Sequence, residues 1–110
     1  HLIVAVQTDP TIDRPSKNKP VQTLEERITV LRGIKWVSEI RTYSTEEQLY
    51  DMLTSLAPDV RILGADWKGK KYTGHDLGHK IVFNSRSHSW SSASLRRRVY
   101  EAELKKVFKM

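Results

Sequence analysis

Three polar segments of the chain carry side chains that could bind a nucleotide or a phosphate group. In residues 64–70, Gly64 would let the backbone approach a ligand, Asp66 could accept a hydrogen bond from a sugar or base, and Trp67 offers a stacking face. The alternative interpretation of this segment is a turn with a half-buried tryptophan. The spacing alone does not decide between the two.

The second segment, residues 86–96, is rich in hydroxyl groups and is expected to run into a helix. Serine hydroxyls and free backbone N–H groups at a helix N-terminus make a site for an anion, and Arg86 could clamp a phosphate with two hydrogen bonds. The alternative is a serine-capped helix in an ordinary polar loop. Arg96, Arg97 and Arg98 must point in different directions on that helix, so some of them are expected to be solvated.

The third segment places Lys17 and Lys19 in a proline-rich loop, with Arg27 on the helix behind it. Lysines on a loop can close over a polyphosphate and neutralise the charge that develops during transfer. The alternative, which the loop taken by itself favours, is that they only keep it solvated. His75 and His79 are four residues apart, but the glycines beside them indicate a surface loop, so we predict no metal site.

The elements expected around these segments alternate between short apolar strands and amphipathic helices. The pattern predicts strands at residues 2–6, 36–42, 60–63 and 80–83, and helices at 23–33, from Ser44 to Pro58, and from Ser91 or Ser92 onward. Capping boxes are predicted for Thr23 with Glu26 and for Ser44 with Glu47. This alternation predicts an α/β fold with a parallel sheet covered by helices on both faces, and ligands beyond the carboxyl ends of its strands.

The composition fits one compact domain, residues 1–110, because 38% of the residues are hydrophobic. There is no cysteine, which excludes disulfides and thiolate metal sites and suits a reducing cytoplasm. No apolar run approaches the roughly 18 residues that a membrane span needs, so we expect no membrane partner. The formal charge of +6 favours an anionic partner without selecting nucleic acid, anionic lipid or nucleotide phosphates.

Four stretches also match, in order, the motifs of a known enzyme family. They are residues 4–9 (VAVQTD), Glu26-Arg27, residues 58–67 (PDVRILGADW) and residues 86–95 (RSHSWSSASL). They resemble the second strand with its Ser/Thr-Asp end, the Glu-Arg helix, the Asp-Val-x-x-x-Gly-Asp-Asp-Trp segment and the Arg-Thr-x-Gly-Ile-Ser-Thr-Thr-x-Ile signature of cytidylyltransferase-type nucleotidyltransferases. The likeness covers nearly the whole chain and is closest to the glycerol-3-phosphate cytidylyltransferase group.

The resemblance implies a Rossmann-like nucleotidyltransferase fold of the HIGH superfamily, of which this chain is the C-terminal three-quarters, and a homodimer. It implies an enzyme that transfers CMP from CTP to a small phosphorylated alcohol or sugar, such as glycerol 3-phosphate, with Mg²⁺ accompanying the nucleotide. Lys19 and Arg86 would be catalytic, with Lys17, Lys19 and Arg27 toward the phosphate of the substrate. In the other register of the loop, Lys17 would take the place of Lys19. The implied nucleotide contacts are Asp66, Trp67, Arg86, Ser87, His88, Ser91, Ser92 and Ala93.

The chain departs from this family at three places. The Gly-Thr-Phe-Asp strand end and the His-x-Gly-His motif are not found in it, and they would lie before His1. That first strand is central in the family fold, so we expect these residues to follow a further N-terminal segment, or to pair with one from another chain, before they are active. A lysine that the glycerol-phosphate enzymes use for substrate falls on Leu49, which puts glycerol phosphate in question. Residues 87–90 also differ from the Arg-Thr-x-Gly-Ile signature, which leaves the base and the acceptor open and keeps ATP-using relatives possible.

Two other functions are compatible with the same residues. One is a non-catalytic nucleotide-binding or regulatory module that keeps the anion site of residues 86–96 without the histidine pair. The other is a basic nucleic-acid-binding domain, suggested by the net charge and by Arg96 to Arg98, which predicts a steep salt dependence of binding. The motifs make the nucleic-acid interpretation the least favoured of the three.

Overall fold

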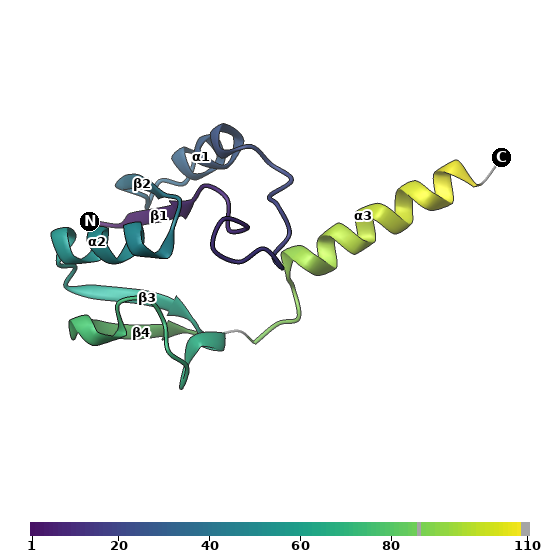
Figure 1. The fold of residues 1–110 in the computed structure, drawn as a ribbon. Coiled ribbons are helices and arrows are strands. Elements are labelled where there is room, and N and C mark those ends of the chain that lie inside the picture. The colour runs from purple at the N-terminus through teal and green to yellow at the C-terminus, as the bar shows by residue number, and fades with distance from the viewer. Residues whose placement is uncertain (86, 109–110) are drawn as a thin grey trace.

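The computed structural model describes residues 1–85 and 87–108, which form short parallel strands and helices (Figure 1). In chain order the elements are β1 (Ile3–Gln7), α1 (Leu24–Arg32), β2 (Glu39–Tyr43), α2 (Glu46–Leu56), β3 (Val60–Gly64), β4 (Lys80–Asn84) and α3 (Ser92–Val107). Short 3₁₀ turns at Ala65–Trp67 and His75–Leu77 interrupt the connection from β3 to β4. The predicted α/β, Rossmann-like fold class is confirmed, with some of its elements lacking.

The strands form two separate parallel pairs. β1 pairs with β2, with Ile3 opposite Glu39, and β3 pairs with β4, with Val60 opposite Lys80. Within residues 1–85 and 87–108, β1 and β3 therefore each keep one edge without a strand beside it.

Local signals in the sequence set the start of α1 as predicted. The Thr23 hydroxyl accepts a hydrogen bond from the Glu26 amide at 3.1 Å, and the Glu26 carboxylate accepts one from the Thr23 amide at 2.9 Å. The helix ends at Gly33, also as predicted, where the Gly33 amide donates to the carbonyl of Val30 at 3.1 Å. Contacts between residues three apart need no other part of the fold, which is why the sequence reveals them.

The capping box of α2 lies one residue later than the predicted pair of Ser44 and Glu47. Thr45 is the cap, and its hydroxyl accepts from the Gln48 amide at 3.2 Å. The Ser44 hydroxyl instead accepts a hydrogen bond from the Thr8 hydroxyl at 2.8 Å, which ties it to the loop after β1. A contact across 36 positions of sequence therefore decided between two adjacent capping residues.

The strand predicted at residues 36–42 begins later, at Glu39. The Val37 amide donates to the carbonyl of Ile34 at 3.1 Å, so the residues after α1 form a turn before the strand starts. Trp36 is 71% exposed on this turn, and the Lys35 ammonium lies 4.6 Å from the centre of its ring. Its aromatic character suggested a strand residue, whereas its ring lies under the lysine ammonium at the surface.

The best-buried apolar side chains of the described residues lie on α2. Leu49 and Leu53 are 9% and 7% exposed, which confirms the apolar stripe predicted for this helix. By contrast, Val60 and Ile62 of β3 and Val82 of β4 are 42%, 60% and 45% exposed. α3 extends away from both sheets and buries none of its side chains (Figure 1). None of the helices in the described ranges has the length and apolar character needed to cross a membrane.

Gly74 is the position where the fold tolerates a side chain least. It is buried with φ +80°, and a Cβ atom there would lie 3.0 Å from Leu53 and 3.1 Å from the Arg61 guanidinium. Gly78 has a similar φ of +75° but nothing within 4 Å of such an atom. We expect Gly74→Ala to lower the free energy of unfolding by about 2–3 kcal/mol and Gly78→Ala by about 1 kcal/mol. Urea denaturation measures both, and equal losses would contradict the steric argument.

Candidate functional site

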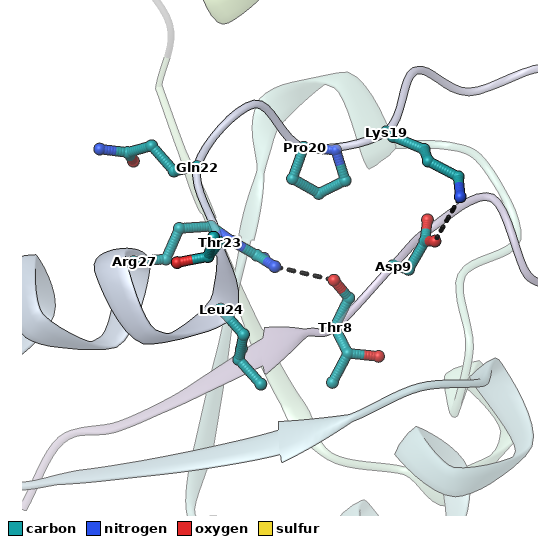
Figure 2. Close-up of a pocket in the computed structure, with 8 residues that line it drawn as sticks. All are labelled: Thr8, Asp9, Lys19, Pro20, Gln22, Thr23, Leu24 and Arg27. Atoms are coloured by element: carbon teal, nitrogen blue, oxygen red, sulfur yellow. Dashed lines mark hydrogen bonds and ion pairs between the residues drawn. The ribbon is translucent and has the colours of Figure 1, made fainter.

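A pocket of about 190 Å³ lies at the carboxyl end of β1, the edge at which an α/β sheet binds ligands (Figure 2). The loop after the strand and the start of α1 contribute its walls. The residues that line it are Thr8, Asp9, Lys19, Pro20, Gln22, Thr23, Leu24 and Arg27. Two of them, Lys19 and Arg27, are among the residues predicted to meet a phosphate.

Arg27 reaches from α1 to the end of β1. Its two Nη atoms donate to the carbonyls of Gln7 and Thr8, each at 2.7 Å, and Figure 2 shows the bond to Thr8. Its Nε atom is buried and has no hydrogen-bond partner among the described residues. Because bonds from a charged donor are strong, this side chain fixes the end of β1 while it places a positive charge in the pocket wall.

Asp9 and Lys19 both line the pocket and point toward each other, with the Lys19 ammonium 4.0 Å from the Asp9 carboxylate (Figure 2). The Asp9 carboxylate also accepts hydrogen bonds from the hydroxyl of Thr11 at 2.6 Å and from its amide at 2.9 Å. These bonds, the hydroxyl first, hold the pKa of Asp9 below its ordinary value. At neutral pH the carboxylate is therefore ionised, and an anionic ligand near Lys19 would compete with it for the ammonium.

The same hydrogen bonds give a pH prediction. We expect Thr11→Val to raise the pKa of Asp9 toward its ordinary value of 3.8, because the largest cause of its lowering is removed. A carboxyl group whose pKa is lowered in the folded state stabilises the fold when the pH is above the ordinary pKa of the group. This contribution is lost as the pH falls through the pKa of the folded state. NMR titration of the Asp9 carboxyl carbon measures the shift, with Thr29→Val as a control on the outer face of α1. An unchanged Asp9 pKa would contradict this assignment.

Asp66 and Trp67 lie in the 3₁₀ turn that follows β3 directly, at the carboxyl end of the second strand pair. The Trp67 ring side chain remains accessible, since the residue is 39% exposed. The turn is closed by a hydrogen bond from the Lys68 amide to the carbonyl of Ala65 at 3.1 Å. Their predicted contact with a nucleotide stays a prediction.

The hydroxyl-rich segment forms the predicted helix start, with Ser91 as the N-cap of α3. The Ser91 hydroxyl accepts from the Ser94 amide at 3.0 Å, and the His88 ring stacks on Trp90 with ring centres 4.7 Å apart. A second pocket of about 360 Å³ is lined by Trp90, Ser91, Ser92, Ser94, Leu95 and Arg98. Of the described residues that line this pocket, Arg98 is the cationic one, and it shares the pocket with three serines.

The predicted site residues are thus distributed between separate places. Lys19 and Arg27 share the first pocket, whereas Ser91 and Ser92 line the second. Other predicted contacts line neither of these pockets: Lys17, Ser87, His88 and Ala93, all exposed. The predicted catalytic Arg86 lies outside the described residues.

Sequence reasoning had passed over Asp9 and Thr8 as pocket residues. The stretch Thr8-Asp9-Pro10-Thr11 carried a usable signal, because an aspartate that accepts from the residue two positions on is typical of a turn. Within residues 1–85 and 87–108, no group of three or more His, Asp or Glu side chains could hold a metal ion.

Comparison with known proteins gives one consistent result. The bifunctional protein HldE of Wolinella succinogenes is 32% identical over 81 residues, and that of Campylobacter concisus is 25% identical over 103 residues. These alignments cover 73% and 93% of this chain but only 17% and 22% of the relatives, so the chain spans about a fifth of their length. The family described as cytidylyltransferase-like matches residues 1–98. The chain therefore belongs to the cytidylyltransferase-like family, whose nucleotidyltransferase motifs its sequence resembles.

Proposed function

We propose that this chain is the nucleotide- and phosphate-binding part of a nucleotidyltransferase that acts on a small phosphorylated alcohol or sugar. The observation that carries the proposal is the pocket at the carboxyl end of β1, where Lys19 and Arg27 line one cavity in a chain of the cytidylyltransferase-like family. A loop lysine and a fixed arginine at such an edge suit a phosphate group.

The proposed reaction transfers a nucleoside monophosphate. A phosphate oxygen of the acceptor attacks the α-phosphorus of the nucleoside triphosphate, a new P–O bond forms there, and the bond to the β-phosphate breaks to release pyrophosphate. The protein contributes position and charge stabilisation. Lys19 would exchange its contact with Asp9 for a phosphate oxygen, while Arg27 keeps the end of β1 in place. Mg²⁺ would enter with the triphosphate and neutralise part of its charge.

The identities of the nucleotide and the acceptor can be narrowed by comparing what the motifs and the relatives favour. The resemblance of the motifs favours CTP and glycerol 3-phosphate, whereas the relatives described above are named HldE and not glycerol-3-phosphate cytidylyltransferase. Leu49 supplies a further argument against glycerol phosphate, because it is 9% exposed within the core and bears no charge for a substrate. We therefore propose CTP or ATP as the nucleotide, and include phosphorylated sugars among the acceptors.

We further infer that another strand joins β1 to β3. Both strands run parallel to their partners and have an open edge, and β1 is a continuous apolar run from Ile3 to Val6 that suits a strand with neighbours on both sides. An open apolar edge favours pairing with another strand. Val60 and Ile62 on the open pair would be covered in such an assembly. The same segment would supply the histidine pair that the family uses.

The test is a pyrophosphate-release assay on the full polypeptide that the gene encodes, with CTP or ATP against glycerol 3-phosphate and a panel of phosphorylated sugars. We expect release with one nucleotide and one acceptor class, and no release by residues 1–110 alone. Tight binding of a nucleotide without pyrophosphate release by the full polypeptide favours a nucleotide-binding or regulatory module instead. If the polypeptide binds DNA or RNA more tightly than either nucleotide, with an affinity that falls steeply with salt, its function is nucleic-acid binding and not nucleotide transfer or nucleotide binding.

A further inference from the structure

Glu46, the first residue of α2, contacts two loops that are far apart in the sequence. Its amide donates to the carboxylate of Asp13, and one carboxylate oxygen lies 3.9 Å from the Arg14 guanidinium. Its other carboxylate oxygen accepts a hydrogen bond from the Thr73 hydroxyl at 2.8 Å. Asp13 and Arg14 belong to loop 8–20, which follows β1, and Thr73 belongs to loop 65–79, which joins β3 to β4. One side chain therefore joins the two loops.

Each of these two loops carries some of the residues assigned to the ligand. Loop 8–20 contains Asp9 and Lys19 of the pocket, and loop 65–79 begins with the turn that holds Asp66 and Trp67. The loops leave the carboxyl ends of strands in different pairs, and no hydrogen bond of the sheets joins those pairs. Contacts at the start of α2 are then a direct means of holding one loop relative to the other.

The surroundings of Glu46 support an organised contact and not a chance surface pair. The Arg61 guanidinium donates to the carbonyl of Thr73, and the Tyr50 hydroxyl donates to Asp76 at 3.0 Å, so loop 65–79 is also attached to its neighbours at Thr73 itself and at Asp76. Tyr43 and Arg61 lie within electrostatic range of Glu46. The Glu46 side chain is 35% exposed, which leaves its bonds only partly screened by water.

We propose that Glu46 is a positioning residue that holds loop 8–20 and loop 65–79 in one arrangement, so that both present their side chains to the same ligand. The part of this statement that concerns the ligand rests on the proposed nucleotide site. Glu46→Gln is the informative change, since the amide keeps the size of the side chain but loses the charge that attracts Arg14 and that strengthens the hydrogen bond from the Thr73 hydroxyl. Its exposed neighbour Glu47 provides the matched control, because Glu47→Gln removes the same charge from the same helical turn.

Amide hydrogen exchange followed by mass spectrometry tests the arrangement without a ligand. We expect Glu46→Gln to raise exchange about three- to fivefold in both loops, with β4 unchanged and Glu47→Gln like the wild type. Arg14→Gln should affect loop 8–20 alone and Thr73→Val loop 65–79 alone. An increase in β4 as large as that in the loops would indicate general destabilisation and overturn the proposal, and so would an equal effect of Glu47→Gln.

Nucleotide binding provides the second readout. With the full polypeptide, Glu46→Gln should raise the Kd for the preferred nucleotide about fivefold, while Glu47→Gln leaves it unchanged. Unchanged binding by Glu46→Gln in a protein whose wild type binds CTP or ATP would overturn the positioning role. If the wild type binds neither nucleotide, the proposed function fails, and the exchange experiment alone decides whether Glu46 joins the loops.

Discussion

Lys19→Ala is expected to slow pyrophosphate release by the full polypeptide about 100-fold, the effect of removing one positioned cation or donor from a developing charge. Lys19 is the lysine of loop 8–20 that lines the pocket, and its ammonium is held 4.0 Å from Asp9. Replacing it removes a positive charge from the place where the triphosphate would lie. The initial rate at saturating nucleotide and acceptor measures the loss.

Two further variants make this prediction specific. Lys17→Ala tests the other register of the loop, and we expect it to cost less than threefold, an effect typical of an exposed charge. Lys35→Ala is the matched control, since Lys35 lies over Trp36 in the turn after α1. A larger loss from Lys17→Ala than from Lys19→Ala would exchange the two roles, and equal rates for all three variants would remove the lysines from the mechanism.

Arg27→Met should lower the free energy of unfolding by about 3 kcal/mol, because two charge-assisted hydrogen bonds to main-chain carbonyls are lost together. Those carbonyls belong to Gln7 and Thr8, and both bonds are 2.7 Å long within a partly buried setting. Methionine keeps an apolar stem against the pocket wall but donates no hydrogen bond. Denaturant unfolding monitored by tryptophan fluorescence measures the change.

The matched control for Arg27 lies on the same helix. Arg32→Met removes an exposed arginine from the last turn of α1, where its favourable interaction with the helix dipole contributes about 0.5 kcal/mol. Arg27→Lys should lose less than Arg27→Met, since a lysine retains the charge but cannot reach both carbonyls with a planar fork. Equal losses for Arg27→Met and Arg32→Met would show that the two hydrogen bonds contribute nothing measurable.

The elements of this fold could be predicted because their signals are local. Thr23 with Glu26 determines the start of α1 through contacts three residues apart, and the spacing of Leu49 and Leu53 identifies the buried face of α2. The short apolar strands were found for the same reason, although Trp36 led to a strand that began too early. An exposed aromatic residue satisfies strand propensity as well as a buried one does, so propensity alone could not place it.

The candidate site was predictable only in part. Lys19 and Arg27 were predicted from the sequence as residues that meet a phosphate. The structure adds that they line one pocket and that Arg27 donates two hydrogen bonds to carbonyls at the end of β1. Asp9 was recognised only as part of a strand-end motif, because nothing in its neighbourhood in the sequence indicates a lysine ten positions away as its partner.

Residue types and spacings of a few positions were enough to predict the helices and strands, most of the predicted helix ends and the family. Which loops meet depends instead on how these elements pack. Ser44 is not the N-cap of α2, because its hydroxyl accepts a hydrogen bond from Thr8. Glu46 contacts both Arg14 and Thr73. Thr73 is 27 positions from Glu46, and Thr8 is 36 positions from Ser44. No periodic pattern encodes such a contact, because it exists only once strands and helices have packed and brought the two segments together.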